Sequence, residues 1–550
     1  MDENGDRDLA GTAEISAGLP PPPQRSTSHS RSSSAGSAGF APASSTKNSV
    51  YSWGRSKNFR LGRNHVNADS RVPEPVEWFT CANASSAASA AVAGAAGSVG
   101  VEGDDSGSLA GAYQSALLRP VVQMAACGGG HTCVLMGDGS VRVFGYSQYG
   151  QLGLGDRTDV CEPTEVRFPS APAAAQASED VACTPSRIIS VACGRYHTIA
   201  LADNGFVYSW GGGKNGRLGH GDEKIHTTPV LIAALAALAA CDKVVRIVCG
   251  YHSNLALTES GRLYSWGWGA HGQLGLGDTE SYMVPTEITY RFPSRVVSIA
   301  CGDRHSFAIT RNGEVFGWGS NEYGQLGTGK KGDVFTLPTQ IKGLMGLVIQ
   351  TVSSGDRFSA ALTNLGSVYT WGCGSDGQLG HGDFRDSLRP KLVEQLPTRA
   401  VDVKCGHNFM LVLTESREVY AWGSNIYGQL GNGGSAKQAA PGHVQLPGSV
   451  SVKGIACAHF HCLLWSAAER TGTGQVMQVS LEDSSNPVKD AGTGQKTNMG
   501  IVDVLNKLEN TYLGTVNHCG KQLSAQMSTR QELISKVEER IISKGASRDG

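Results

Sequence analysis

Val207-Tyr208-Ser209-Trp210-Gly211, followed by Leu218-Gly219, is the stretch of sequence that decides the fold. The same signature, an aromatic residue and a glycine followed eight residues later by Leu-Gly, occurs seven times along the chain. Its copies begin at Trp53, Phe144, Trp210, Trp266, Trp318, Trp371 and Trp422. From Trp210 onward the copies are 51 to 56 residues apart, so the sequence predicts structural repeats of that length.

Two further sequence features, which we call repeat marks, recur at fixed positions relative to this signature. A proline follows the aromatic residue by 19 or 20 residues in six copies, and a Cys-Gly or Ser-Gly pair precedes it in the six later copies. Between the marks, short segments rich in β-branched residues alternate with turns such as Asp138-Gly139 and Asn204-Gly205, which tolerate the positive φ of hairpin turns. Each repeat is therefore predicted to be a small antiparallel sheet. Radial stacking of such sheets covers the faces that one sheet alone would leave exposed.

The two ends of the repeat region complement each other. The first repeat begins directly with its Tyr51–Trp53 strand, and the last ends in Cys462-Leu463-Leu464-Trp465 with no aromatic-Gly pair after it. We infer that strands between Val452 and Trp465 complete the first sheet and close a ring, which removes an exposed sheet edge. The predicted fold is an all-β, seven-bladed β-propeller over residues 49–466, closed by pairing of its N- and C-terminal strands.

Several segments fall outside the repeat pattern. Residues 1–48 are rich in serine, proline, glycine and alanine and are predicted to be a disordered arm. Insertions of small residues lie at about 80–116 and 170–185, and residues 467–499 form a polar linker. Residues 500–545 are predicted to be a helical tail, because its apolar residues recur every three or four positions: Ile501, Leu505, Leu508 and Tyr512. Two short amphipathic helices fit this tail better than one long coiled coil; they either mediate self-association or partner binding, or pack on the propeller.

Composition excludes several classes of function. The formal net charge is −1, and residues 1–48 carry four basic and five acidic residues, so direct nucleic-acid binding is not expected. No apolar run approaches the roughly 20 residues of a membrane helix, and the acidic start of the chain does not resemble a signal peptide. The 14 cysteines include no CxxC pair, and five of them recur once per repeat beside a glycine: Cys127, Cys193, Cys249, Cys301 and Cys405. They are interpreted as small, buried, reduced thiols of an intracellular protein, cytoplasmic or nuclear.

These marks resemble the regulator of chromosome condensation repeat family. The match covers roughly residues 50–466, and segments such as Gly377-Gln378-Leu379-Gly380-His381-Gly382-Asp383 are specific to that family. The resemblance implies a seven-bladed propeller whose last strands close onto the first blade. It does not imply one function, because the family includes exchange factors for the Ran GTPase, a plant ultraviolet photoreceptor and many adaptor domains.

No set of residues predicts catalysis, a cofactor or a metal. Four histidines, each four residues after a cysteine, stand one to a blade, too far apart to share an ion: His131, His197, His305 and His461. Phe358 and Phe409 replace them in two repeats, so they are interpreted as structural residues that hydrogen-bond between loops. The Gly-x-Leu-Gly-x-Gly-Asp motif lacks the Lys-Ser/Thr of a phosphate loop. The repeat aromatics are interpreted as core residues, because each stands on a strand at a fixed distance from a glycine turn.

The two residues that precede the histidine, or the residue that replaces it, lie on loops that a propeller displays together on one face. The frame around these positions is constant, whereas the positions themselves mix charges with aromatic rings, as protein-binding surfaces do; ordinary solvated loops are the alternative. The candidate partner-binding residues are Arg195, Tyr196, Tyr251, His252, Asp303, Arg304, Asp356, Arg357, His407 and Asn408.

Two functions remain open. The first is a non-catalytic scaffold that presents this loop face to protein partners, and the second is guanine-nucleotide exchange on a Ran-like small GTPase. As the resemblance implies, exchange uses an acidic residue before the fourth Trp-Gly unit, a histidine before the sixth and a wedge in the third. The loops of this chain hold Tyr251-His252 and Asp356-Arg357 with no insertion at residues 211–222, so the scaffold is favoured. Photoreception is rejected because the Gly-x-x-His loops contain no tryptophan.

Overall fold

The structure is a computed structural model that describes residues 49–63, 69–79, 121–169, 187–448 and 450–466. The predicted N-terminal arm, the two insertions, the linker and the helical tail with its proposed self-association lie outside the described residues. Within the described part, no helix has both the length and the apolar character needed to cross a membrane.

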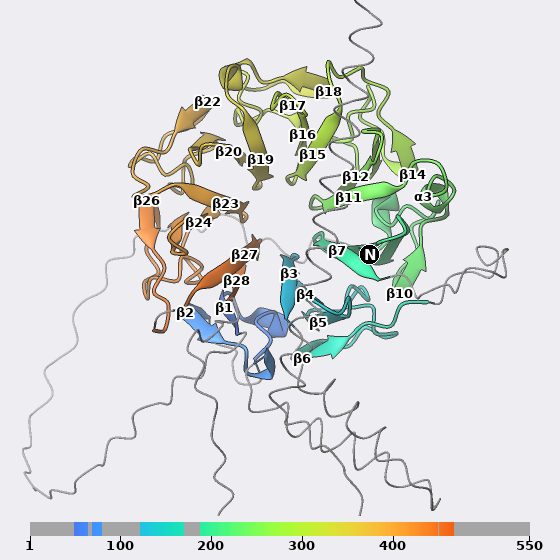
Figure 1. Cartoon of the computed structure of the whole chain (residues 1–550), viewed down its shortest axis with the longest axis horizontal. Helices are drawn as coiled ribbons and strands as arrows, with labels where there is room; N and C mark the ends of the chain where they lie inside the picture. Colours follow the sequence, from blue (N-terminus) through green and yellow to red (C-terminus); the bar gives the residue numbers. More distant parts are fainter. Residues whose placement is uncertain (1–48, 64–68, 80–120, 170–186, 449, 467–550) are drawn as a thin grey trace, which may run out of the picture. The chain divides into compact units, whose positions relative to one another are not determined.

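Seven four-stranded antiparallel sheets make up the described part of the chain. They stand radially around a central opening, as Figure 1 shows. The sequence prediction of a seven-bladed, all-β propeller is therefore confirmed.

Each sheet forms one blade of the ring. Blade 1 contains β1 (Val50–Gly54), β2 (Ser70–Pro75), β27 (Val452–Ala458) and β28 (His461–Ser466). Blade 2 contains β3 (Val122–Cys127), β4 (His131–Met136), β5 (Val141–Gly145) and β6 (Val160–Glu165). Blade 3 contains β7 (Ile188–Cys193), β8 (His197–Ala202), β9 (Val207–Gly211) and β10 (His226–Leu231). Blade 4 contains β11 (Val244–Cys249), β12 (Ser253–Thr258), β13 (Leu263–Gly267) and β14 (Tyr282–Glu287).

The remaining blades follow the same plan. Blade 5 contains β15 (Val296–Cys301), β16 (His305–Thr310), β17 (Val315–Ser320) and β18 (Val334–Gln340). Blade 6 contains β19 (Ile349–Ser354), β20 (Phe358–Thr363), β21 (Val368–Gly372) and β22 (Ser387–Leu392). Blade 7 contains β23 (Ala400–Cys405), β24 (Phe409–Thr414), β25 (Val419–Gly423) and β26 (Gln438–His443). Short helical turns lie between strands: α3 (Ala233–Ala236), η1 (Lys57–Phe59), η2 (Glu77–Phe79), η4 (Lys214–Gly216) and η5 (Lys342–Leu344).

The hydrophobic core lies between neighbouring blades. One cluster contains Leu135 and Val141 of blade 2 together with Val191, Ala200 and Trp210 of blade 3. The second strand of each blade is buried along its whole length, because adjacent blades cover both of its faces. A small sheet gains its stability from such packing, so each blade depends on its neighbours.

The repeated proline stands on the outermost strand of its blade. Pro229 lies in β10 and Pro285 in β14, the strands at the outer edges of blades 3 and 4. Proline has no N–H to donate, so it is tolerated on an edge strand and blocks pairing with a further strand. The proline mark of the sequence therefore protects the outer edges of the ring.

The repeat signature joins neighbouring blades. Trp318 of β17 is fully buried and packs against Gly275 of the preceding blade, where a Cβ atom would lie 2.7 Å from the indole Nε1. The Nε1–H donates to the main-chain oxygen of Gln273 at 2.9 Å. Equivalent ring-to-glycine contacts occur at every junction of the ring: Phe144 with Gly62, Trp210 with Gly153, Trp266 with Gly219, Trp371 with Gly327, Trp422 with Gly380 and Trp53 with Gly431. We call this contact the aromatic interlock. Within one repeat, the aromatic residue thus contacts the preceding blade, and the glycine of the Leu-Gly pair contacts the following blade.

The glycine that follows the aromatic residue is required by the backbone. Gly319 has φ of +105°, and a Cβ atom there would lie 2.4 Å from the carbonyl oxygen of Arg304. Other residues avoid this conformation, and the neighbouring strand leaves no room for a side chain. The aromatic-Gly pair is therefore a packing requirement on both of its residues.

Blade 1 is built from both ends of the described chain. β1 pairs antiparallel with β28 in continuous register from Val50 opposite Trp465 to Gly54 opposite His461. The sheet order is β2-β1-β28-β27, and Trp53 of β1 donates its indole N–H to Gln429 of blade 7 at 2.9 Å. The predicted closure of the ring is confirmed.

Trp318→Ala is expected to destabilise the propeller by about 3–5 kcal/mol, the usual cost of truncating a buried aromatic side chain. The substitution leaves a cavity at the blade 4–blade 5 junction and removes one of two donors to the Gln273 carbonyl. Trp318→Phe is the matched control, because Phe144 fills the same position in blade 2, and it should cost clearly less. Denaturant unfolding measures the free energy of unfolding of both variants. If both lost the same free energy, the proposed role of the aromatic interlock would be contradicted.

Candidate functional site

Two sets of loops meet at one end of every blade. One joins the first and second strands and holds the Gly-x-x-His residues, and the other follows the aromatic-Gly pair of the third strand. Backbone hydrogen bonds tie them together: the amides of Gly212, Trp268 and Ser320 donate to the carbonyls of Tyr196, His252 and Arg304. We call this end of the propeller the loop face.

The ten candidate residues form five pairs of adjacent residues, one pair to each of five blades. The first residue of each pair lines the central channel. The inner strands of all seven blades surround this channel, which has a volume of about 370 Å³. The residues at its loop-face end are Arg195, Tyr251, Asp303, Asp356 and His407, together with His459 of the last unit. The sequence pattern predicts that all ten candidates lie on loops of one face, and the structure shows that five of them line the channel at that face.

A stacked and hydrogen-bonded network bridges this end of the channel. Tyr251 Oη and His459 Nε2 are 2.5 Å apart, although their blades, 4 and 1, are not neighbours in the ring. The His459 ring lies 4.8 Å from the ring of His407, whose Nδ1 is 3.6 Å from the Asp356 carboxylate. The Arg195 guanidinium lies 4.7 Å above the Tyr251 ring. These side chains therefore contact each other more than they contact solvent.

Burial shifts the protonation of this network. It raises the pKa of Asp303 well above the usual range, and the neighbouring Asp356 carboxyl adds to the effect. It lowers the pKa of His407 and of His459, and raises the pKa of Tyr251. Each shift favours the neutral form, as expected for ionisable groups removed from water. The channel mouth is thus a packed polar bridge between blades.

The second residues of the pairs do not line the channel. The side chains of Arg304 and Arg357 are both 37% exposed. The side chains of Asp303 and Asp356 beside them are 13% and 7% exposed. The arginine Nε atoms lie 3.6 and 3.1 Å from these carboxylates. The Asp356 carboxylate therefore holds the Arg357 guanidinium on its buried side, and both guanidinium groups remain partly exposed to solvent.

Six partly exposed rings form a continuous series on the loop face, which we call the aromatic arc. Its members, in order across blades 2, 3 and 4, are Tyr146, Tyr149, Tyr196, His252, Trp268 and His271. Successive ring centroids are 6.4, 4.7, 6.4, 5.7 and 4.9 Å apart. All six residues are half-buried, so each ring is fixed by its neighbours and still presents part of its surface to solvent.

Two arc residues, Tyr196 and His252, are among the candidates predicted from sequence, and the other four were missed. The missed residues stand two or five positions after a repeat aromatic, on loops that reach the same face only when the blades are stacked. A signal was present in the sequence: the position five after the aromatic residue is Tyr149, His271, Tyr323 or Tyr427 in four repeats.

The four repeat histidines join neighbouring blades. His131 Nε2 lies 2.9 Å from Thr198 Oγ1, and His305 Nε2 lies 2.8 Å from Ser359 Oγ. His197 and His461 make equivalent bonds to Asn254 and Thr132. The predicted hydrogen-bonding role is therefore found, but the bonds connect second strands of adjacent blades rather than loops.

Seven four-stranded blades that interlock through a repeated aromatic residue, and close through one shared blade, define a repeat-built β-propeller. The chain belongs to the RCC1-like domain family, whose model matches residues 93–464. This match confirms the family resemblance found in the sequence.

Similar proteins have diverse roles. The ultraviolet-B receptor UVR8 of Arabidopsis thaliana is 35% identical over 344 residues, which cover 62% of this chain and 74% of the receptor. The E3 ubiquitin-protein ligase HERC2 of Homo sapiens is 39% identical over 284 residues, which cover 51% of this chain but 6% of the ligase. Human WBSCR16 superimposes with a TM-score of 0.59 at 24% identity, over 76% of this chain and 99% of that one. Prp20p of Saccharomyces cerevisiae, described with its binding to Gsp1p and histones, superimposes with a TM-score of 0.61 at 20% identity, over 78% and 93%. Both structures share the fold with this chain.

Acid should destabilise the propeller as the pH falls below about 6.5, the usual histidine pKa. Burial lowers the pKa of His131 and of His197 to about 3 and that of His305 to about 4. Between these values and 6.5 the unfolded chain binds more protons at these three histidines than the folded chain does, so they make the free energy of unfolding decrease with falling pH.

His305→Phe tests this assignment, because Phe358 and Phe409 fill the same position in blades 6 and 7. The variant should fold and should lose up to about 1.4 kcal/mol per pH unit of the acid dependence between pH 6.5 and 4. Denaturant unfolding at several pH values measures the slope. An unchanged slope would show that His305 is already protonated in the folded state.

Proposed function

We propose that this propeller is a non-catalytic scaffold that holds a protein partner on its loop face, with the aromatic arc as the principal contact. The observation that carries the proposal is the arc itself. Tyrosine and tryptophan rings that are fixed by their neighbours bury large areas on binding at little cost in side-chain entropy, and they dominate the energetics of protein interfaces.

The shape of the arc favours a protein over a small ligand. Its rings follow one another across three blades on the outer part of the face, whereas the channel mouth beside it is occupied by the Tyr251–His459 bridge. A small flat ligand is normally enclosed in a concave pocket, whereas an extended series of rings suits a broad partner surface.

Charge adds specificity to this surface. Arg304 and Arg357 stand on blades 5 and 6, and the Arg357 guanidinium lies 4.6 Å from the Tyr323 ring. Arginine is enriched at interfaces because its planar group pairs with carboxylates and stacks on rings. We infer that the partner combines an apolar or aromatic patch, which covers the arc, with acidic groups that meet these arginines.

Nucleotide exchange on a Ran-like small GTPase is the second candidate. Support comes from Prp20p, which has the same fold and is described with its binding to Gsp1p. The fold itself is shared with a photoreceptor and with part of a ubiquitin ligase, so function depends on the loop face rather than on the propeller.

Replacement of Tyr149, Tyr196 and Trp268 by serine should abolish partner capture by the purified chain while the propeller stays folded at the temperature of the assay. Interface tyrosine and tryptophan residues cost about 2 kcal/mol or more each when truncated. The matched control replaces Met345 and Leu365 by serine, because these exposed apolar residues lie in connections at the opposite ends of the blades. The measurement is the amount of the same partner captured by the unaltered chain, the arc variant and the control variant. If the arc variant captured as much partner as the unaltered chain, the aromatic arc would not be the contact surface.

Release of labelled GDP from a Ran-type GTPase separates the two candidates. If the chain is a scaffold only, labelled GDP should leave the GTPase at its spontaneous rate even in the presence of micromolar chain. Acceleration that is lost on reversing Arg304 and Arg357 to glutamate would instead establish exchange activity on the same face.

A further inference from the structure

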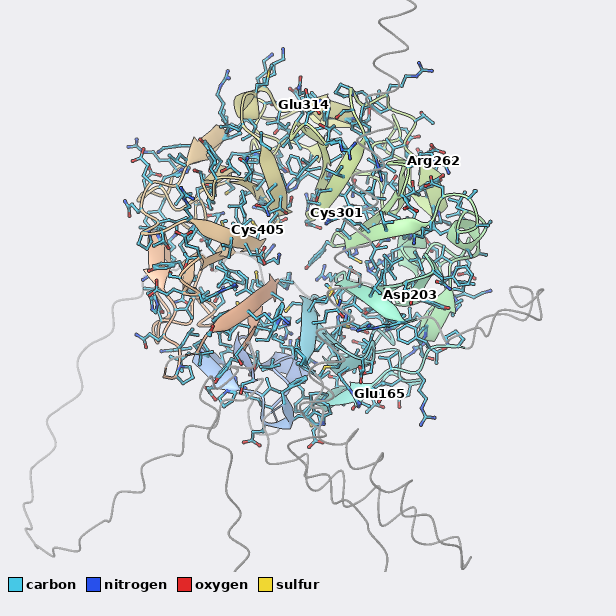
Figure 2. All side chains as sticks on the ribbon, viewed as in Figure 1. Glu165, Asp203, Arg262, Cys301, Glu314 and Cys405 are labelled. Carbon is cyan, nitrogen blue, oxygen red and sulfur yellow. The ribbon has the colours of Figure 1, made fainter. Side chains whose placement is uncertain are left out.

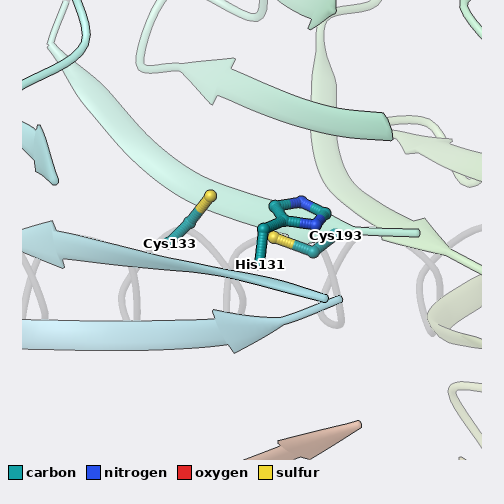
Figure 3. Close-up of side chains that lie close together, drawn as sticks. All are labelled: His131, Cys133 and Cys193. Carbon is teal, nitrogen blue, oxygen red and sulfur yellow. The ribbon is translucent and has the colours of Figure 1, made fainter. Parts of the chain in front are cut away.

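Three metal-binding side chains meet at the junction of blades 2 and 3. His131 and Cys133 lie on β4, Cys193 ends β7, and their ligand atoms all lie within 4.8 Å of one another (Figure 3). His131 and Cys133 are fully buried, and Cys193 lines the central channel. The cluster is thus enclosed by the blade junction on one side and reached from the channel on the other.

Comparison among the repeats shows that the third ligand is special to this junction. A histidine and the following repeat's cysteine recur at equivalent positions elsewhere, as His197 with Cys249. The position of Cys133, in contrast, is apolar in the other six repeats: Ile199, Leu255, Phe307, Ala360, Leu411 and Leu463. The fold therefore needs an apolar side chain there and does not need a thiol. Figure 2 labels two cysteines of the recurrent kind, Cys301 and Cys405, beside the central opening.

The hydrogen bonds of His131 leave one nitrogen free to bind a metal. Thr198 Oγ1 donates its proton to the Gln151 carbonyl at 2.9 Å, so it must accept from His131 Nε2–H at 2.9 Å. The Nδ1 atom then carries an unprotonated lone pair, and it is buried without a hydrogen-bond partner. A hydrogen bond that fixes the second imidazole nitrogen is the usual arrangement around a metal-bound histidine.

We propose that His131 Nδ1, Cys133 Sγ and Cys193 Sγ bind a Zn²⁺ ion, with a water molecule from the central channel as the fourth ligand. Two thiolates neutralise the charge of the ion, which suits a site with an apolar surrounding. Three protein ligands of the Cys₂His type with one open position are an established zinc arrangement.

The geometry requires only a small contraction. Ligand atoms 2.0–2.3 Å from one tetrahedral ion lie about 3.5–3.8 Å apart. In the structure one ring nitrogen of His131 and the two sulfur atoms lie within 4.8 Å of one another, so these separations have to shrink by about 1 Å when the ion binds. Cys193 gives up its S–H contact with the Ala126 carbonyl, at 3.6 Å, when it binds the ion as thiolate.

Cobalt titration of the full chain tests the site, because Co²⁺ replaces Zn²⁺ and reports thiolate ligands by charge-transfer absorption in the near ultraviolet. The reduced, chelator-treated protein should bind one equivalent of Co²⁺ with intense tetrahedral bands, and Zn²⁺ should displace it and raise the melting temperature. Cys133→Leu, the residue found in three other repeats, should lose the bands while keeping the fold. Cys405→Ser is the matched control, because Ser354 fills that position in blade 6, and it should leave the bands unchanged.

A second substitution tests the site by gain rather than by loss. Ile199→Cys places the missing thiol beside His197 and Cys249 at the next junction, so the variant should bind two equivalents of Co²⁺. Absence of thiolate bands in the unaltered protein would overturn the proposal. Bands that survive in Cys133→Leu would do the same, as would a Cys133–Cys193 disulfide that forms in air and resists a mild excess of Zn²⁺.

Discussion

The contact between a buried aromatic ring and the Leu-Gly glycine of the preceding blade is the constraint on which this propeller depends. At each of the seven junctions the ring occupies the space that a side chain on the glycine would take. In five of them the indole N–H also satisfies a buried main-chain carbonyl. A blade cannot bury its own faces, so the interlock makes the stability of each sheet a property of the ring.

The loop face follows from this packing. Stacking brings the Gly-x-x-His loops and the loops after the third strands to one end, where backbone hydrogen bonds join them. The inner residues of that end then meet across the channel, as Tyr251 and His459 do, and the outer residues form the aromatic arc. A surface of fixed rings with partly exposed arginines is thus a consequence of the same geometry that stabilises the ring.

Sequence spacing predicted the fold because each repeat mark has a physical cause that recurs in every blade or at every blade junction. Trp318 has to pack on the preceding blade and Gly319 has to adopt a positive φ, so equivalent residues recur in register in the other repeats. The complementary ends of the repeat region indicated that they share one blade. The site was predicted less well. Whether Arg195 or Tyr196 faces the channel depends on the direction of a loop side chain, which no period encodes. The partners of Tyr196 in the arc, Tyr149 and His252, come from other blades and become neighbours only after closure. The cluster of His131, Cys133 and Cys193 was not predicted for the same reason, because Cys193 comes from the following repeat.

Native-state hydrogen exchange in a Trp53→Ala variant tests the central claim most directly. Trp53 lies in the closing strand β1 and interlocks with Gly431 of blade 7. If the ring is one cooperative unit, amides of the distant strand β16 should lose as much protection, in free energy, as amides of β28. Loss of protection confined to blades 1 and 7, with β16 unchanged, would contradict the account.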